Sequence, residues 1–259
     1  MESRQMIERA LASGYEFKPS SYISSGIDIF KKNPGGYLGF VVLFGIIYMI
    51  INFIPFLGMF IWIIIGPALG MGFAIAAHRQ EKMNDLEFGN FFKGFDHIAQ
   101  LIVANIILMI IFLIIALPLI FMLGFSFFSA MGSGDVEAIN DFSSQMAGMG
   151  IWILVVALLF MYIAISLRWT NNLIVFHKYD AVSAIKTSWQ LVHKNWFSHL
   201  VFMLLCLLLA LGGLILLVIG LLFAYPIILV SDYAGYADVT GLLKSDSVID
   251  EIGVDQDMV

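Results

Sequence analysis

An amphipathic segment that leads directly into a long, almost uncharged stretch is the feature that most restricts the fold of this chain. Residues 180–196 read DAVSAIKTSWQLVHKNW. Helical spacing places an apolar stripe along one side of this segment, formed by Val182, Ile185, Trp189, Val192 and Trp196. Residues 196–237 then carry one formal charge, Asp232. This combination predicts a helix that lies in the membrane surface and leads into a transmembrane hairpin.

The composition places the whole chain in the same class. Apolar residues make up 61% of the 259 residues and charged residues only 12%, whereas soluble domains average roughly half apolar and a quarter charged. The net charge of -6 does not favour nucleic acid as a partner. The chain has a single cysteine, Cys206, so an intrachain disulfide is excluded.

The first 19 residues form a separate N-terminal segment, which we expect to be cytoplasmic. Charges are spread through MESRQMIERALASG, with no apolar centre and no cleavage site, so it does not resemble a signal peptide. Its apolar residues share one helical side: Met6, Ile7, Ala10 and Leu11. We expect a short amphipathic helix that touches the membrane surface or packs beneath the bundle.

An internal repeat relates the start of the chain to the segment at 180–196. Ile23 corresponds to Ile185, an offset of 162 residues. The same offset places Ile27, Phe30, Lys32, Asn33 and Pro34 on Trp189, Val192, Lys194, Asn195 and Trp196. A weaker third copy, at an offset of 61, places Ile27, Phe30, Lys32 and Pro34 on Phe88, Phe91, Lys93 and Phe95. We therefore expect three interfacial helices, each followed by transmembrane segments.

Six apolar segments are long enough to cross a bilayer core, which needs about 20 helical residues. They lie in a membrane domain at residues 20–241, with predicted spans at 34–53, 56–77, 97–123, 150–176, 196–218 and 221–237. We place the last turn near Ile219 and Gly220, with Gly212 and Gly213 as the competing site. Residues 242–259 are acidic and expected to be flexible. The predicted fold is an all-α, polytopic membrane helix bundle.

The basic residues orient this bundle. All 13 Lys and Arg residues lie before the first span, between the second and third, toward the end of the fourth, between the fourth and fifth, or after the sixth. The loop at residues 124–150 carries only the acidic residues Asp135, Glu137 and Asp141. The positive-inside rule then predicts cytoplasmic N and C termini in the inner (cytoplasmic) membrane of the cell.

Several motifs resemble a known group of bacterial proteins. In chain order they are FKKNPGGYLGF, GPALGMGFAIAAHRQ, FGNFFKGFDHIAQ, AIKTSWQLVHKNWF and YPIILVSDYAGYADV. The chain from about Ser20 to Gly241 resembles the six-span membrane domain found ahead of some glycerophosphodiester phosphodiesterases, and related integral membrane proteins of unknown role. The resemblance implies the membrane fold. It supplies no catalytic residue, and we expect no attached phosphodiesterase domain.

Motifs for catalysis or metal binding are absent from the sequence. There is no Gly-rich phosphate loop, no His-Glu-x-x-His, no cysteine pair and no Gly-x-Ser-x-Gly elbow. The five histidines fall at or near the cytoplasmic face, and no two have the i, i+4 spacing of a helical ligand pair. We expect no enzyme activity, no cofactor and no metal.

Polar residues inside the spans are the strongest site candidates, because a charge in a bilayer is rare unless it is paired or functional. They are Arg168, Asp232, Asn105, Asn171 and Asn172. Arg168 lies about 12 Å below the cytoplasmic end of the fourth span and Asp232 about 9 Å below the end of the sixth, at the helical rise. Their similar depth and opposite charge predict an ion pair, while contact with a substrate, an ion or a lipid phosphate is the alternative.

Two further sets of residues are expected to shape the membrane domain. Anchors at the membrane interface are predicted at Lys32, Asn33, Lys93, Lys194, Asn195, Trp189 and Trp196. Helix kinks are predicted at Pro67, Pro118 and Pro226.

The sequence favours a non-enzymatic integral membrane protein that binds lipids or a protein partner on its cytoplasmic interfacial helices. The partners would be membrane lipids and a membrane or cytoplasmic protein. The alternative is a small transporter or permease component that uses kinked helices at Pro67 and Pro226. An intramembrane lipid enzyme is disfavoured, because no paired carboxylates or nucleophile-base set is present.

Overall fold

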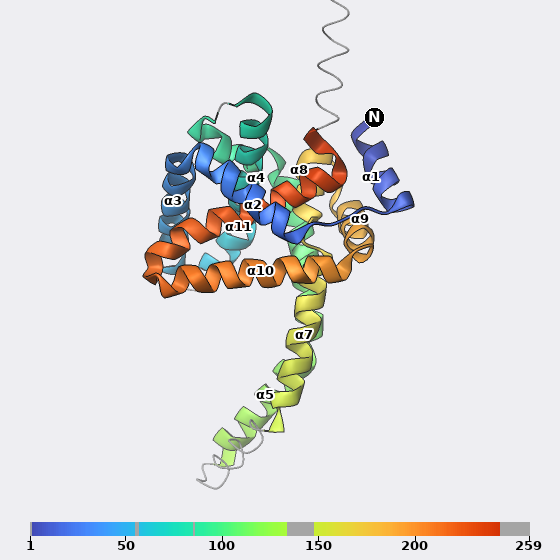
Figure 1. Ribbon diagram of the computed structural model, residues 1–259. Helices are drawn as coiled ribbons and strands as arrows, with labels where there is room; N and C mark the ends of the chain where they lie inside the picture. The colour runs from blue at the N-terminus through green and yellow to red at the C-terminus, as the bar shows by residue number, and fades with distance from the viewer. Residues whose placement is uncertain (1, 55–56, 85, 134–147, 244–259) are drawn as a thin grey trace, which may run out of the picture. The chain divides into compact units, whose positions relative to one another are not determined.

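The computed structural model describes residues 2–54, 57–84, 86–133 and 148–243, and the elements within these ranges are helices (Figure 1). Helices long and apolar enough to cross a membrane occur at residues 34–52, 57–83, 88–125, 150–177, 196–215 and 219–240. This confirms the predicted all-α polytopic bundle and the class of multi-pass membrane protein. The acidic tail beyond residue 243 and the loop acids Asp135, Glu137 and Asp141 lie outside the described residues.

The helices follow the chain with short connections. Their bounds are α1 Glu2–Ser13, α2 Pro19–Lys32, α3 Pro34–Asn52, α4 Leu57–Met83, η1 Phe88–His97, α5 Ile98–Ser133, α7 Gly150–Ser166, α8 Thr170–His177, α9 Ala181–His193, α10 Trp196–Ile215 and α11 Leu217–Thr240. Most are α-helices, but η1 is a 3-10 helix. The segment predicted as the third interfacial helix is therefore helical, with a tighter winding than an α-helix.

The chain forms two compact units. One unit comprises residues 1–104 and 166–259, and the other comprises residues 105–165. In the smaller unit, α5 and α7 contribute Phe112 and Phe160, whose rings lie 5.0 Å apart. Many of its apolar side chains are exposed, which is the expected surface for a hairpin surrounded by lipid. The larger unit holds Arg168, Asp232, Asn171 and Asn172, the polar candidates other than Asn105.

Local sequence signals explain where α2, α3 and α9 begin. Asp180 caps α9, since its carboxylate accepts hydrogen bonds from the backbone of Val182 at 3.1 Å and Ser183 at 3.0 Å. Asn33 ends α2 and caps α3, accepting a bond from the Gly36 backbone at 2.9 Å. Pro19 starts α2, where its missing N–H leaves no helical bond unmade.

The N-terminal helix packs on the protein, one of the two outcomes expected for it. Ile7 and Ala10 are buried, while Met6 and Leu11 are half-buried. Helix α1 contacts α9 and α11. The predicted apolar side of α1 is therefore the side that meets the rest of the larger unit.

The turn between the last two spans differs from both predicted sites. Helix α10 continues through Gly212 and Gly213, and the chain turns at Leu216. Gly213 and Gly220 instead allow the two helices to approach closely, because a Cβ on Gly213 would lie 2.9 Å from the Gly220 carbonyl oxygen. Two helices that approach this closely can be joined by a single residue.

Other span ends also moved, and one predicted span is broken. Helix α4 continues to Met83 and α5 to Ser133, since a helix can extend past the apolar segment when its end is solvated. The fourth span was predicted as one helix over 150–176. It is interrupted between α7 and α8, at residues 167–169.

Candidate functional site

The interruption of the fourth span is held in place by a side chain from α9. The Ser188 hydroxyl donates to the Ser166 carbonyl oxygen at 3.2 Å and accepts from the Trp169 backbone N–H at 3.2 Å. All three residues are fully buried. Backbone groups freed within a membrane segment must find partners inside the protein. Ser188 supplies two of these bonds and so explains why the break is tolerated.

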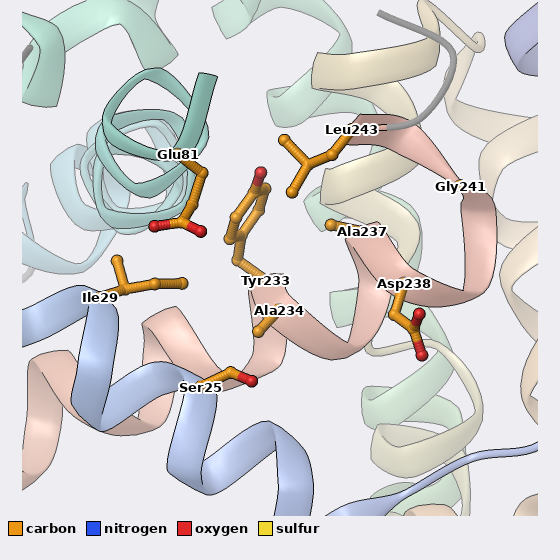
Figure 2. Close-up of a pocket in the computed structure, with 9 residues that line it drawn as sticks. All are labelled: Ser25, Ile29, Glu81, Tyr233, Ala234, Ala237, Asp238, Gly241 and Leu243. Carbon is orange, nitrogen blue, oxygen red and sulfur yellow. The ribbon is translucent and has the colours of Figure 1, made fainter. Parts of the chain in front are cut away.

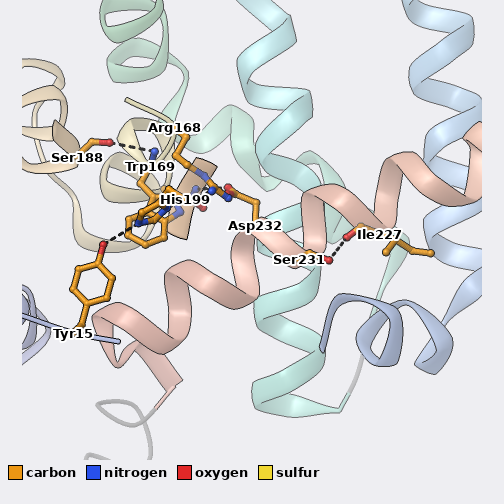
Figure 3. Close-up of polar contacts among 9 residues, drawn as sticks. Tyr15, Arg168, Trp169, Ser188, His199, Ile227, Ser231 and Asp232 are labelled. Atoms are coloured by element: carbon orange, nitrogen blue, oxygen red, sulfur yellow. Dashed lines mark hydrogen bonds and ion pairs between the residues drawn. The ribbon is translucent and has the colours of Figure 1, made fainter. Parts of the chain in front are cut away.

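Arg168 lies in this interruption and forms an ion pair with Asp232 of α11 (Figure 3). Arg168 Nε donates to Asp232 Oδ1 at 2.8 Å, and its terminal Nη2 contacts the same oxygen. The Asn172 side-chain amide donates to Asp232 Oδ2 at 3.4 Å. The side chains of Arg168 and Asp232 are only 13% and 24% exposed. The structure thus brings together three of the five polar candidates, and the two charges neutralise each other.

His199 connects this ion pair to the N-terminal segment. Its Nδ1 lies 3.4 Å from Arg168 Nη1, and its Nε2 lies 2.9 Å from the Tyr15 hydroxyl. The Tyr15 hydroxyl donates its own hydrogen to the Leu191 carbonyl oxygen at 2.8 Å. It therefore accepts from His199 Nε2, which assigns the imidazole hydrogen to Nε2 and leaves Nδ1 as the acceptor for Arg168.

Aromatic rings surround the cationic side of the cluster. The Arg168 guanidinium lies over the Phe202 ring at 4.4 Å and near the Trp169 ring at 5.8 Å. The Trp169 and His199 rings meet edge to face at 4.7 Å. Ring faces carry negative charge density, so they stabilise the guanidinium together with Asp232.

Sequence reasoning missed Tyr15, Ser188 and His199. His199 was grouped with the other histidines near the cytoplasmic face, and Tyr15 was assigned no role. Ser188 carried a usable signal: Ala181, Ala184 and Ser188 follow helical spacing, and small residues at this spacing indicate a closely packed helix face. Nothing in the sequence around Tyr15 indicates that it reaches His199.

The two remaining asparagine candidates lie elsewhere. Asn105 opens the smaller unit, on α5. Asn171 is half-buried on α8, next to Asn172. The helices run unbroken through Pro67, Pro118 and Pro226, so the break falls where the sequence has no proline.

The predicted interfacial anchors divide into protein contacts and exposed side chains. Lys32 pairs with Glu81 at 2.5 Å, and the Asn195 amide donates to the Tyr15 carbonyl oxygen at 2.5 Å. Trp189 stacks on His193 at 4.3 Å, and Trp196 meets Phe197 edge to face at 5.5 Å. Lys93 lies 3.9 Å from Asp96, and Lys194 is exposed.

The last turns of α11 bind several other elements through polar side chains. The Tyr233 hydroxyl lies 2.9 Å from His78 Nδ1 of α4, and the Tyr236 hydroxyl lies 2.6 Å from His177 Nδ1 of α8. From α2, Tyr22 donates to Asp238 at 2.7 Å. Burial and this carboxylate raise the pKa of Tyr22 well above its usual value. The end of α11 is therefore a junction of the larger unit.

A cavity of about 180 Å³ lies at this junction (Figure 2). Its walls come from α2, the end of α4 and the end of α11, including Ser25, Glu81, Tyr233 and Asp238. The Arg168 cluster does not line it. Within the described ranges, no group of three or more His, Cys, Asp or Glu side chains is arranged to hold a metal ion.

The fold and this cluster define a multi-pass helical membrane protein with an ion pair at a broken span. Residues 94–252 match the family described as DUF7847, a domain of unknown function, and the chain belongs to this family. The matched region contains both Arg168 and Asp232. Neither the curated proteins nor the solved structures include a match to the chain. The resemblance to phosphodiesterase-associated membrane domains stays a prediction.

Proposed function

We propose that the protein is a non-enzymatic membrane component that binds lipids along α9 and α2. The observation that carries this proposal is the way α9 packs. Helix α9 buries small side chains, Ala181, Ala184 and Ser188, against the protein. The first part of its apolar stripe is left open instead, with Val182 50% exposed and Ile185 half-exposed, whereas Val192 near the end of the helix is buried.

An exposed apolar stripe beside lysines is the pattern of a helix in the membrane surface. On α9 the exposed lysines are Lys186 and Lys194. Helix α2 has the same organisation, with Ile23 and Ile27 half-exposed and Lys31 exposed. Lysines near a membrane surface attract anionic lipids. The positive-inside rule supports placing this side, and both termini, in the cytoplasm.

The Arg168 cluster supports a structural role over catalysis. Arg168, Asp232, His199 and Asn172 bond to one another. A catalytic acid or base needs a position from which it can reach a substrate. The buried charges of Arg168 and Asp232 instead bond to each other and to neighbouring protein side chains.

Spin labels on α9 test whether the stripe faces lipid. In a Cys206→Ala background, Val182→Cys and a control on the polar side of α9, Gln190→Cys, would be labelled in proteoliposomes with phosphatidylglycerol. The label at Val182 should collide with oxygen, which concentrates in lipid, and the label at Gln190 with a water-soluble nickel complex. Equal nickel accessibility at both positions would rule out a membrane-surface position for α9.

A transporter is the second candidate, and the broken fourth span favours it. Interrupted membrane helices with charged residues at the break are a recurring design of transport sites. The interruption lies at Arg168 and not at Pro67 or Pro226. Uptake of a charged solute into proteoliposomes that is abolished by Arg168→Gln would favour this candidate over lipid binding.

A further inference from the structure

The short segment between α1 and α2, residues 14–18, packs its aromatic side chains into the Arg168 cluster. We name it the N-terminal strap. Phe17 is 5% exposed and stacks on the His199 ring at 3.9 Å. The rings of Trp169 and Phe202 also lie within 5.9 Å of Phe17. Phe17 thus fills an aromatic site built by the break and α10.

The strap covers the residue that touches the ion pair. Tyr15 bonds to His199 Nε2, while His199 Nδ1 faces Arg168 Nη1. His199 itself is fully buried. Tyr15 and Phe17 therefore lie on the outer side of a chain of contacts that runs through His199 to Arg168 and Asp232. Burial also raises the pKa of the Tyr15 phenol, so this group stays neutral beneath the surface.

The strap is attached by side chains and has a free pivot at each end. Gly14 adopts a left-handed φ of +73°, and a Cβ at this position would meet nothing within 4 Å. At the other end, Lys18 precedes α2 without a side-chain cap. Of the strap backbone, the Tyr15 carbonyl accepts a bond from Asn195 and the Lys18 carbonyl accepts one from Tyr22. The middle of the strap can thus leave without breaking a helix.

The closed position also leaves a polar group unpaired. Trp169 Nε1 is buried and has no hydrogen-bond partner among the described residues. A buried donor without a partner is unfavourable, because it has lost its bond to water. The Trp169 ring lies 6.5 Å from that of Tyr15 and 5.9 Å from that of Phe17. Water admitted on opening of the strap would offer Trp169 Nε1 a partner.

We propose that the N-terminal strap is a removable cover that controls water access to His199, the buried residue that contacts Arg168 of the ion pair. The structure shows the closed state, in which Phe17 and Tyr15 cover His199. In the open state the strap pivots at Gly14 and Lys18, and water reaches His199 from the side that the strap now covers. This inference is independent of lipid binding along α9.

The labelling rate of Cys206, the only cysteine in the sequence, can be used to measure opening of the strap. Cys206 lies one helical turn after Phe202 on α10 and is 8% exposed. In nanodiscs, a membrane-impermeant maleimide should label Cys206 slowly in the native chain. Phe17→Ala should raise this rate about tenfold or more, and Tyr15→Phe by a smaller factor, because local opening sets the exposure of a buried group.

A matched variant separates opening from general destabilisation. Phe73→Ala removes a fully buried aromatic from α4, away from the strap, and should leave the labelling of Cys206 slow. An unchanged rate in Phe17→Ala, or an equal rise in Phe73→Ala, would overturn the proposal.

A second measurement applies even if Phe17→Ala does not fold. Spin labels at Glu16→Cys and Lys194→Cys in a Cys206→Ala background should give two distances, a major closed one and a minor open one. One narrow distance under all lipid compositions would also overturn the proposal.

Discussion

The helix pairs α2–α3 and α9–α10 begin at equivalent positions of the sequence, but their buried side chains make different contacts. Helices α2 and α9 start at Pro19 and Ala181, 162 residues apart, and α3 and α10 start at Pro34 and Trp196, again 162 apart. The linking asparagines share a backbone conformation, with φ of −146° at Asn33 and −142° at Asn195. We propose that these are two copies of one repeat.

The buried positions also correspond, but their chemistry differs. Helix α2 buries Tyr22, Gly26, Ile29 and Phe30, and the same offset gives the buried residues Ala184, Ser188, Leu191 and Val192 of α9. Gly26 allows close approach, since a Cβ there would lie 2.9 Å from Ser231 Cα of α11. Ser188, at the equivalent position, uses its hydroxyl to hold the broken span.

The first residues of the following spans differ in the same way. Tyr37 and His199 are equivalent in register, and both are fully buried. Tyr37 donates to the neutral Gln80 side chain at 2.8 Å, whereas His199 contacts Arg168. At this position the α2–α3 copy makes a hydrogen bond between neutral side chains, whereas the α9–α10 copy contacts a charged one. A shared scaffold therefore does not imply a shared site.

Breaking the ion pair between Arg168 and Asp232 should change the stability of the protein more than any other proposed substitution. Among the described residues, the pair α2–α3 has no equivalent ion pair. Arg168→Ala or Asp232→Ala leaves a buried charge unpaired and should lower the free energy of unfolding by about 3 kcal/mol. The double variant should recover part of this loss. Reversible unfolding in mixed micelles would measure all three, and additive losses would show that the two side chains do not couple.

Substitutions at the equivalent small residues Gly26 and Ser188 should distinguish the roles of the two copies. Gly26→Leu has no room against α11 and should cost about 2 kcal/mol through overpacking. Ser188→Gly removes the bonds that hold the break and should cost about 1–2 kcal/mol through unpaired backbone groups. The same unfolding assay applies, with Ser24→Leu on the exposed side of α2 as the control. Equal tolerance of both core substitutions would contradict these different roles.

Removing the hydroxyl of Tyr37 tests the neutral copy. Tyr37→Phe should cost about 1 kcal/mol, since it breaks one hydrogen bond to Gln80 and leaves the ring in place. It should not change the labelling rate of Cys206. A faster rate in this variant would mean that the two copies are coupled.

The smallest effect should appear as a pH dependence of α9 alone. Hydrogen bonds from Ser183 and Val182 lower the pKa of Asp180 below its usual value of 3.8. Its capping contribution is therefore present above that value and is lost as pH falls through the lowered pKa. A spin label at Lys186→Cys should gain mobility in acid and one at Ser24→Cys on α2 should not, because α2 lacks a side-chain cap. Equal pH profiles would exclude Asp180 as the cause.

The sequence alone predicts the features that depend on composition and depth. The apolar lengths locate the spans, the offset of 162 places the starts of α3 and α10, and depth pairs Arg168 with Asp232. The break at residues 167–169 was not predictable in this way. Leu167 and Trp169 are apolar, and the partner that makes the break tolerable, Ser188, comes from a later helix. The packing of the N-terminal strap on His199 was not predictable for the same reason, because Tyr15 and His199 are far apart in sequence.

The broken span has a mechanical consequence. An intact helix carries bending and twisting along its length through its own hydrogen bonds. At residues 167–169 this continuity is lost, and the boundary between the two compact units falls next to it, at Ser166. Bending or twisting of α7 is therefore not passed on to α8 through a continuous ladder of helical hydrogen bonds. The Ser188 hydroxyl, which bonds to residues on both sides of Leu167 and Arg168, is a side-chain link that remains across the interruption.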